Sequence, residues 1–333
     1  MRARVVAALL LLVLPLAACS EQGGGDELQV VENPKAAVAP ASPPASVRPA
    51  GRVLPAQGTV NALATDAGSR TLAVSVTEPA AVLLYDLDRL DAPARSVSLP
   101  SPAQDLAVSG DTLLAALPAA GKLARIRLPG GELTTVPVAG APAGVAADGE
   151  RTLVALREGK GVAVLRGDRV GETITDGLYS ADDVLVADGA AVVLDRERTA
   201  VFSVDVAAGH IGEGLRAGQG ATNAVVDSYG RVFVVDTRRG ALLAFSADPL
   251  LLRQRYPVPG GAYGIAYDPR RHLVWVTLTR RNEVVAFDVR GGEPREKYRY
   301  PTVTQPNSVT VDERTSRVVI GSAAGEGIQV IAL

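Results

Sequence analysis

Oxygen-bearing side chains recur at the start of short apolar segments along this chain. There are seven such segments, and successive ones begin 43, 39, 39, 41, 40 and 44 residues apart. The third segment differs from the others because it begins with Ala143. Carboxylate, amide and hydroxyl oxygens gathered into one ring would suit a hard cation or a polar ligand. The candidate ligand-binding residues are Asn61, Gln104, Asp105, Asp182, Asp183, Asn223, Tyr263 and Asn307.

A structural role for the same residues stays open. Asn and Asp side chains commonly hydrogen-bond to nearby backbone at turns and strand starts, without any ligand. Two basic turns, Thr237-Arg238-Arg239 and Thr279-Arg280-Arg281, are expected to be either solvated loops or part of a protein-contact rim.

Acid–base catalysis most often uses histidine, and the chain contains two, His210 and His272. Neither stands beside an acid or nucleophile at a spacing that indicates a catalytic pair, so surface or turn histidines are expected. Cys19 is the only cysteine, which excludes disulfides, thiolate catalysis and Cys-ligated zinc from residues 20–333. No catalytic residue is assigned, and whether the protein is an enzyme stays open.

The N-terminus has the layout of an export signal. Arg2 and Arg4 precede an apolar stretch, Val5 to Ala18, which is short for a membrane span of roughly 20 residues. The sequence Leu16-Ala17-Ala18-Cys19 resembles the lipobox of bacterial lipoproteins. This resemblance implies a signal peptide over residues 1–18, diacylglycerol and palmitate on Cys19, and attachment to the extracytoplasmic side of the cell membrane. An ordinary secretory signal with an incidental Cys19 is the alternative.

Residues 19–50 are rich in Gly, Pro, Ala and Ser, which predicts a flexible tether. The net charge of −2 becomes −4 without residues 1–18, which hold two arginines and no acid. Mild acidity without a basic run argues against nucleic acid as a partner. A monomer is expected.

Residues 51–333 contain seven copies of one unit. In the fifth, the first apolar segment is followed by Arg231–Asp236, Ala241–Ser246 and Arg253–Val258, with Gly, Asp and Arg at the turns. A period near 40 residues with four short strands is typical of a β-propeller blade. The sequence therefore predicts an all-β, seven-bladed β-propeller. Its inner strands line a central channel and begin at a loop-rich surface, here named the top face.

The seventh unit stops after its third strand, at Leu333. Gly51–Ala56 resembles Arg95–Pro100, the segment that precedes the second repeat. We expect this N-terminal strand to complete the last blade and remove the open edges of the ring. The tether is then expected to leave from the opposite, bottom face, with the channel mouth pointing away from the membrane.

Two units also carry family motifs. Ala224–Asp227, Gly230 and Phe233–Asp236 resemble an NHL repeat. Trp275–Leu278 with Val285–Asp288 is similar to a YVTN-type repeat, although Leu278 stands where that family has Asn. The resemblance implies a propeller but no particular reaction, because this fold hosts binding proteins, lyases, lactonases and scaffolds.

Two types of enzyme share this fold, but the site residues of neither have a full set of counterparts in this sequence. Streptogramin lyases use a His-dependent, Mg-assisted site, and too few histidines stand here in comparable positions. Gluconolactonase-type propellers use Glu, Asn and Asp as metal ligands. Asn223 and Asn307 could supply the Asn, but the early Glu is missing, since the first unit begins Asn61-Ala62.

The expected function is a membrane-anchored binding scaffold whose top face holds an envelope protein or a polar ligand. The alternative is a lyase or lactonase-like enzyme that depends on a divalent metal, with its site at the channel mouth. No cofactor is predicted for the scaffold, whereas the alternative would use Ca or Mg in the central channel.

Overall fold

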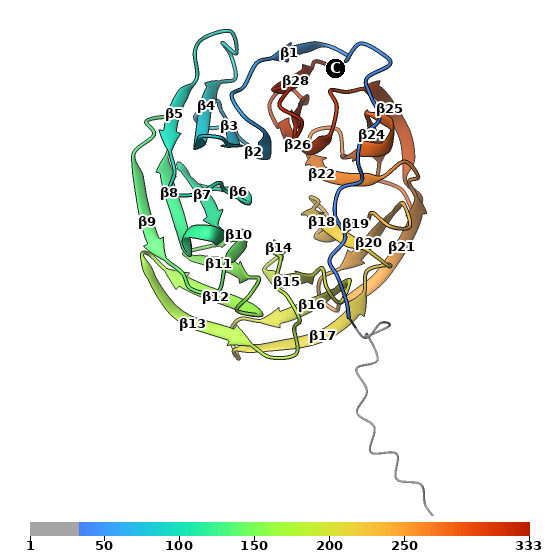
Figure 1. Cartoon of the computed structure of the whole chain (residues 1–333). Helices are drawn as coiled ribbons and strands as arrows, with labels where there is room; N and C mark the ends of the chain where they lie inside the picture. Colours follow the sequence, from blue (N-terminus) through green and yellow to red (C-terminus); the bar gives the residue numbers. More distant parts are fainter. Residues whose placement is uncertain (1–32) are drawn as a thin grey trace, which may run out of the picture.

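The computed structural model describes residues 33–333. The predicted signal peptide and Cys19 lie outside the described residues. Seven antiparallel sheets of four strands each stand around a central channel, as Figure 1 shows. The predicted all-β, seven-bladed propeller is thereby confirmed.

Each blade contributes one strand to each of four rings. The inner strands are β2 (Val60–Asp66), β6 (Asp105–Ser109), β10 (Pro142–Asp148), β14 (Asp183–Ala187), β18 (Ala221–Val226), β22 (Ala262–Asp268) and β26 (Pro306–Asp312). The second strands are β3 (Thr71–Thr77), β7 (Thr112–Leu117), β11 (Arg151–Leu156), β15 (Ala190–Asp195), β19 (Arg231–Asp236), β23 (Leu273–Leu278) and β27 (Arg317–Ser322).

The third strands are β4 (Ala80–Asp86), β8 (Lys122–Arg127), β12 (Gly161–Arg166), β16 (Ala200–Asp205), β20 (Ala241–Ser246), β24 (Glu283–Asp288) and β28 (Ile328–Ile331). The outer strands are β5 (Arg95–Ser98), β9 (Leu133–Pro137), β13 (Arg169–Thr175), β17 (His210–Arg216), β21 (Leu251–Pro257), β25 (Arg295–Pro301) and β1 (Arg52–Leu54). Two 3₁₀ turns, η1 (Pro118–Ala120) and η2 (Thr279–Arg281), complete the elements. No helix within residues 33–333 has the length and apolarity to cross a membrane.

The strand sequences follow the burial of each ring. Second strands are apolar on both sides because the neighbouring blades cover both, and β23 is buried at all six positions. Outer strands face solvent, so in β13 only Ile174 is buried. Trp275, Phe233 and Phe245 are among the largest fully buried side chains, and they pack between adjacent blades.

The N-terminal strand closes the ring as expected. β1 pairs antiparallel with β28, with Arg52 opposite Val330 and Leu54 opposite Ile328. Gly51 allows this approach, because a Cβ there would collide with the backbone of Val330 and its φ of +67° is left-handed. A second link joins blades 1 and 7, where Arg70 donates two hydrogen bonds to Asp312 at 2.7 and 2.9 Å.

The pairing pattern defines the two faces. The inner strands begin at the top face. The loops between second and third strands lie at the same face. In blade 5, for example, Ala221 and Ala241 both pair with Asp236. The loops between first and second strands, and those between third and fourth strands, lie at the bottom face.

The chain before β1 differs from the free tether expected up to Ala50. Residues 35–43, here named the strap, cross the top face from blade 5 toward blade 6, in front of the sheets in Figure 1. Backbone carbonyls of the strap accept hydrogen bonds from Arg238, Arg196, Gln305 and Asn282, all on top-face loops. Ala37 is buried.

The expected departure of the tether from the bottom face is therefore wrong. The outer strand β1 does run from bottom to top, but the chain before it crosses the top face and reaches Ala50 beside the top end of β25. There the Ala50 amide donates to the Pro301 carbonyl at 3.0 Å. Donors presented by four separate loops hold the strap, and no local sequence pattern indicates such a contact.

Candidate functional site

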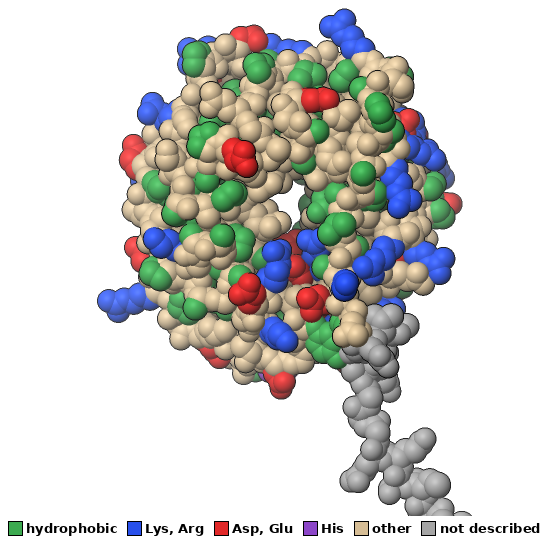
Figure 2. Space-filling view, viewed as in Figure 1, with side chains coloured by type: hydrophobic (Ala, Val, Ile, Leu, Met, Phe, Trp, Pro, Cys, Tyr) green, Lys and Arg blue, Asp and Glu red, His purple; other side chains and the backbone are tan. Residues whose placement is uncertain are grey.

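The starts of the inner strands enclose a cavity of about 130 Å³ at the top of the channel. Six of the eight candidate residues line it: Asn61, Gln104, Asp105, Asp183, Asn223 and Asn307. This channel mouth is open on the top face, and Figure 2 shows the opening at the centre of the molecule. The propeller thus brings together residues that are up to 246 positions apart in sequence.

Irregular strand pairing positions several of these side chains. The register between first and second strands shifts at Val60/Ala62, Ala221/Ala224 and Pro306/Ser308, so Asn61, Asn223 and Asn307 stand at bulged positions. A bulge re-aims the side chain of the extra residue, here toward the mouth.

The third blade lets two carboxylates approach each other. Blade 3 has Gly144 at the start of its inner strand, and a Cβ there would lie 2.6 Å from the Cα of Asp183. On the other side of this blade, the Val145 amide donates to Asp105 Oδ2 at 2.9 Å. Asp105 and Asp183 therefore flank a blade that has no side chain of its own between them.

The two carboxylates disfavour each other's ionisation. Burial raises the pKa of Asp183 well above its usual range, and the charges of Asp105 and Asp182 raise it further against the Val184 amide and Arg196. Burial also raises the pKa of Asp105, against amide hydrogen bonds from Val145 and Leu106. A proton, a metal cation or a cationic side chain placed between them would relieve this repulsion.

The mouth amides bind neighbouring groups through their NH₂ ends. Asn223 Nδ2 donates to the Tyr263 carbonyl at 2.9 Å, and Asn61 Nδ2 to the Ala103 carbonyl at 3.4 Å. These bonds to the next blade match the structural role considered above. The Oδ1 atoms of both residues accept no hydrogen bond from residues 33–333, so they can face a ligand as acceptors.

Two candidate residues do not line the mouth. Asp182 is buried and engaged elsewhere, since it accepts hydrogen bonds from Arg157 Nε at 2.7 Å and from Ser180 Oγ at 2.5 Å. Tyr263 contributes its backbone carbonyl to Asn223, as described above.

Sequence reasoning missed the link between the strap and the mouth. Gln305 Nε2 donates both to the Pro40 carbonyl and to Asn307 Oδ1, each at 2.9 Å. Arg196 donates to the Ala37 carbonyl, and its charge also lowers the pKa of Asp183. The run of Pro, Ala and Ser in the strap resembles an ordinary linker, so its composition gave no signal of this role.

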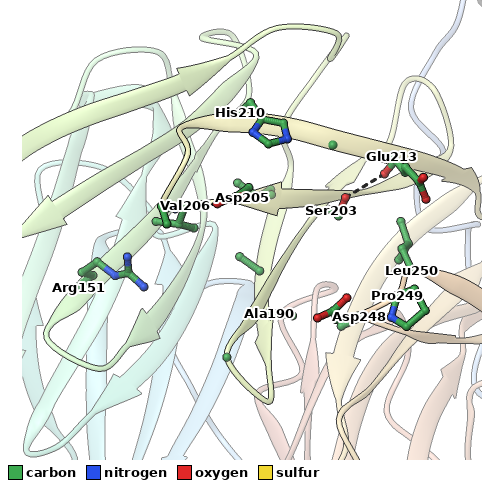
Figure 3. Close-up of a pocket in the computed structure, with 16 residues that line it drawn as sticks. Arg151, Ala190, Ser203, Asp205, Val206, His210, Glu213, Asp248, Pro249 and Leu250 are labelled. Carbon is green, nitrogen blue, oxygen red and sulfur yellow. Dashed lines mark hydrogen bonds between the residues drawn. The ribbon is translucent and has the colours of Figure 1, made fainter.

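Both histidines lie on the bottom face. His210 opens β17 and lines a concavity of about 610 Å³ between blades 4 and 5, shown in Figure 3. Hydrogen bonds from the Ala208 and Ala207 amides, with a smaller contribution from His210, lower the pKa of Asp205, so this carboxylate mainly caps its own turn. Asp248 in the same concavity comes from the next blade. His272 bonds to Tyr267 Oη at 2.9 Å, in the bottom loop of blade 6. The channel mouth therefore contains no histidine.

A metal site would have to rely on two acids and on amide oxygens. No three His, Cys, Asp or Glu side chains within the described part of the chain lie close enough together to hold an ion. Asp105, Asp183 and the Oδ1 atoms of the mouth amides are oxygen donors of the kind that Ca²⁺ and Mg²⁺ accept. They could hold such an ion only if water completed its coordination.

Comparison with known proteins establishes the fold alone. No protein-family model matches the chain, and no curated protein matches it. A streptogramin B lyase superposes with a TM-score of 0.71 at 12% identity, over 86% of this chain and 97% of its own. Hydrazine synthase of Kuenenia stuttgartiensis gives 0.71 at 15% identity, over 85% and 98%.

The β-propeller domain of Cps50 (Swd1) from Myceliophteria thermophila gives a TM-score of 0.70 at 13% identity, over 85% of this chain and 98% of its own. A lyase, a synthase and a Swd1 domain thus share one architecture at identities too low to imply a shared activity. The chain is a seven-bladed β-propeller whose four-stranded sheets converge on an acidic, amide-lined channel mouth.

Proposed function

We propose that the protein is a membrane-anchored, extracytoplasmic binding scaffold whose channel mouth receives a cationic group of an envelope partner. The observation that carries the proposal is the pair Asp105 and Asp183, both with raised pKa, beside amide oxygens in an open mouth. The lipobox-like Leu16–Cys19 supports the anchoring.

The volume of the mouth limits the size of the chemical group that it can hold. A cavity of about 130 Å³ is well below the roughly 300–1,000 Å³ of a pocket for a whole small molecule. It has room for one ammonium or guanidinium group with its waters, or for one hydrated ion. The rest of the partner would lie over the top face, on loops beside the mouth.

The experiment is site-specific photo-cross-linking in intact cells, with the photoreactive residue at Gln104 in the mouth. We expect a defined protein adduct that disappears in the Asp105→Asn/Asp183→Asn variant. A photoreactive residue at the exposed Thr173 of β13 serves as the control, and it should give no such adduct. An adduct that persists in the double variant would contradict recognition by the two acids.

A second candidate is the metal-dependent lyase or lactonase-like enzyme, favoured by the same oxygen-lined mouth. It requires a resident divalent ion, whereas the scaffold does not. Metal analysis of protein purified without chelators separates the two. Stoichiometric Ca or Mg that is lost in the Asp183→Ala/Asn223→Ala variant would favour the enzyme and count against the scaffold.

A further inference from the structure

Basic side chains gather on one sector of the top face. The loops between second and third strands carry Arg238-Arg239 in blade 5 and Arg280-Arg281 in blade 6. Neither loop contains an acidic residue. Arg255 follows on the outer strand β21, and all five side chains are exposed. These five residues are named the basic sector. Figure 2 shows basic side chains grouped over this side of the top face.

The sector stands out from the composition of the chain. Residues 221–300 hold 13 Arg and Lys against eight Asp and Glu, although the whole chain has a net charge of −2. The corresponding loops of blades 7 and 1 carry an acid and no base, Glu326 and Glu78 respectively. Blades 5 and 6 therefore carry a net positive charge, whereas the rest of the chain is net acidic.

The side chains of the sector form no ion pairs within residues 33–333, although Arg281 lies near enough to Glu296 to help Arg299 lower the pKa of that carboxyl. Other arginines of these blades have acidic partners, such as Arg231 with Asp227, Arg290 with Asp288 and Arg299 with Glu283. The side chains of Arg239, Arg255, Arg280 and Arg281 make no ion pair. Arg238 donates only to the backbone carbonyls of Gln219 and Lys35, which leaves its positive charge in place.

The strap reaches the propeller at this sector, since Lys35 is the residue that bonds to Arg238. Only thirteen residues, 20–32, lie between Cys19 and residue 33. They span at most about 50 Å when fully extended, and roughly 20 Å as a coil. A lipid on Cys19 would therefore keep the basic sector close to the bilayer surface.

We propose that the basic sector docks on the anionic phospholipid headgroups of the membrane in which the protein is anchored. Blades 5 and 6 then face the bilayer, and the channel mouth tilts toward its surface, within reach of membrane-bound partners. The proposal rests on the proposed anchoring for its geometry, but the sector's affinity for anionic lipid can be measured without the anchor. Arginine near an anionic surface is attracted by the surface potential, which salt screens.

The test uses the exported chain, residues 19–333 with Cys19→Ser, which contains every described residue and carries no lipid. Its binding is measured by co-sedimentation with phosphatidylcholine vesicles, with or without one-third phosphatidylglycerol. We expect binding only to the phosphatidylglycerol vesicles, and loss of it at high salt. The Arg280→Glu/Arg281→Glu variant should bind at least tenfold more weakly, since each arginine contributes roughly a fivefold factor.

The control is Arg166→Glu/Arg169→Glu, which changes the net charge equally but whose positions flank the bottom-face loop between β12 and β13 of blade 3. It should bind nearly as well as the unsubstituted chain, and circular dichroism should show that both variants fold. Equal weakening by both variants, or no preference for phosphatidylglycerol, would overturn the proposal. So would binding to soluble polyphosphate without binding to the vesicles.

The anchor is tested separately, by labelled palmitate on Cys19 and by release of a Cys19→Ala variant from the membrane fraction. A labelled Cys19 with no binding of the unlipidated chain to anionic vesicles would leave the anchor in place and reject the basic sector. The reverse outcome would reject the anchor alone.

Discussion

At the scale of single residues, the channel mouth is a place where the fold accepts an unfavourable charge arrangement. Asp105 and Asp183 come from different blades and meet because Gly144 has no side chain to separate them. Each carboxyl is buried enough that its pKa is raised. A cluster that weakens the folded state persists most readily where it binds something.

Because of this arrangement, the free energy of unfolding depends on pH through the protonation of Asp183. A raised pKa means that the folded state holds the Asp183 proton more tightly than the unfolded chain. The resulting stabilisation is complete below the unfolded pKa and is lost as pH rises through the folded pKa. Asp183→Asn should therefore raise the free energy of unfolding by about 1 kcal/mol at pH 7 and by almost nothing at pH 4.

Urea denaturation at the two pH values measures this difference. The Glu172→Gln variant, on the exposed outer strand β13, is the control and should change little at either pH. A loss of stability in Asp183→Asn at pH 7 would mean that the ionised carboxylate is stabilising and that the repulsion is absent.

At the scale of elements, the strap is held through its backbone. Its carbonyls at Ala37, Pro40 and Pro43 accept hydrogen bonds from three different loops, at a spacing of three residues. Three residues per turn is the repeat of a polyproline II helix, in which one row of carbonyls can face the same surface. The prolines thus suit a docked, extended segment as well as a free linker.

Gln305 is the residue on which the strap most depends. Its side-chain Nε2 donates to the Pro40 carbonyl, and its side-chain Oε1 accepts from the Ser42 backbone amide at 3.0 Å. Its backbone amide donates to the Ser42 hydroxyl at 2.8 Å. Gln305→Ala should speed hydrogen exchange at the Ser42 amide at least tenfold. It should also lower the free energy of unfolding by about 1 to 2 kcal/mol.

Hydrogen-exchange mass spectrometry on residues 33–50 checks this expectation. Gln104→Ala is a matched control, because Gln104 is exposed on the same face and makes no hydrogen bond to the strap. Unchanged exchange at Ser42 in Gln305→Ala would show that the other loop contacts hold the strap without Gln305.

At the scale of the whole molecule, stability depends on closing the ring between the last blade and the first. β1 contributes only three residues to that closure, so contacts between side chains of the first and last blades also stabilise the junction. The Arg70–Asp312 pair lies there on the bottom face, and the Asp312 side chain is fully buried. Burial acts to raise the pKa of Asp312, but hydrogen bonds from Arg70 and Thr315 lower it to about 2.

Removing Arg70 would leave that carboxylate without its cation. Arg70→Ala should lower the free energy of unfolding by about 2 to 4 kcal/mol at pH 7. Because the folded pKa is depressed, the stabilisation from Asp312 is complete above its ordinary pKa and is lost as pH falls toward 2. The difference between Arg70→Ala and the unsubstituted protein should therefore shrink in that range.

Denaturant unfolding from pH 7 down to pH 2.5 tests this window. Arg290→Ala is the control, because it breaks an ion pair in which Arg290 is 59% exposed, and such a pair contributes at most about 1 kcal/mol. Equal losses in the two variants would indicate that the ring junction has no special dependence on Arg70.

The sequence by itself determined the architecture and most of the channel mouth. Each repeat places its polar residue at the start of an apolar strand, and any ring of such repeats gathers those starts around one axis. Asn61, Gln104, Asp105, Asp183, Asn223 and Asn307 therefore followed from periodicity alone. The closing strand also followed, because the seventh unit lacked its fourth strand and the segment before the first unit matched it.

Only the tertiary structure decided what depends on contacts between distant parts of the chain. It turned Asp182 toward Arg157, brought Asp105 and Asp183 together across Gly144, and placed the strap on the top face. None of these features has a local pattern, because their energies come from groups that meet only after the ring has closed.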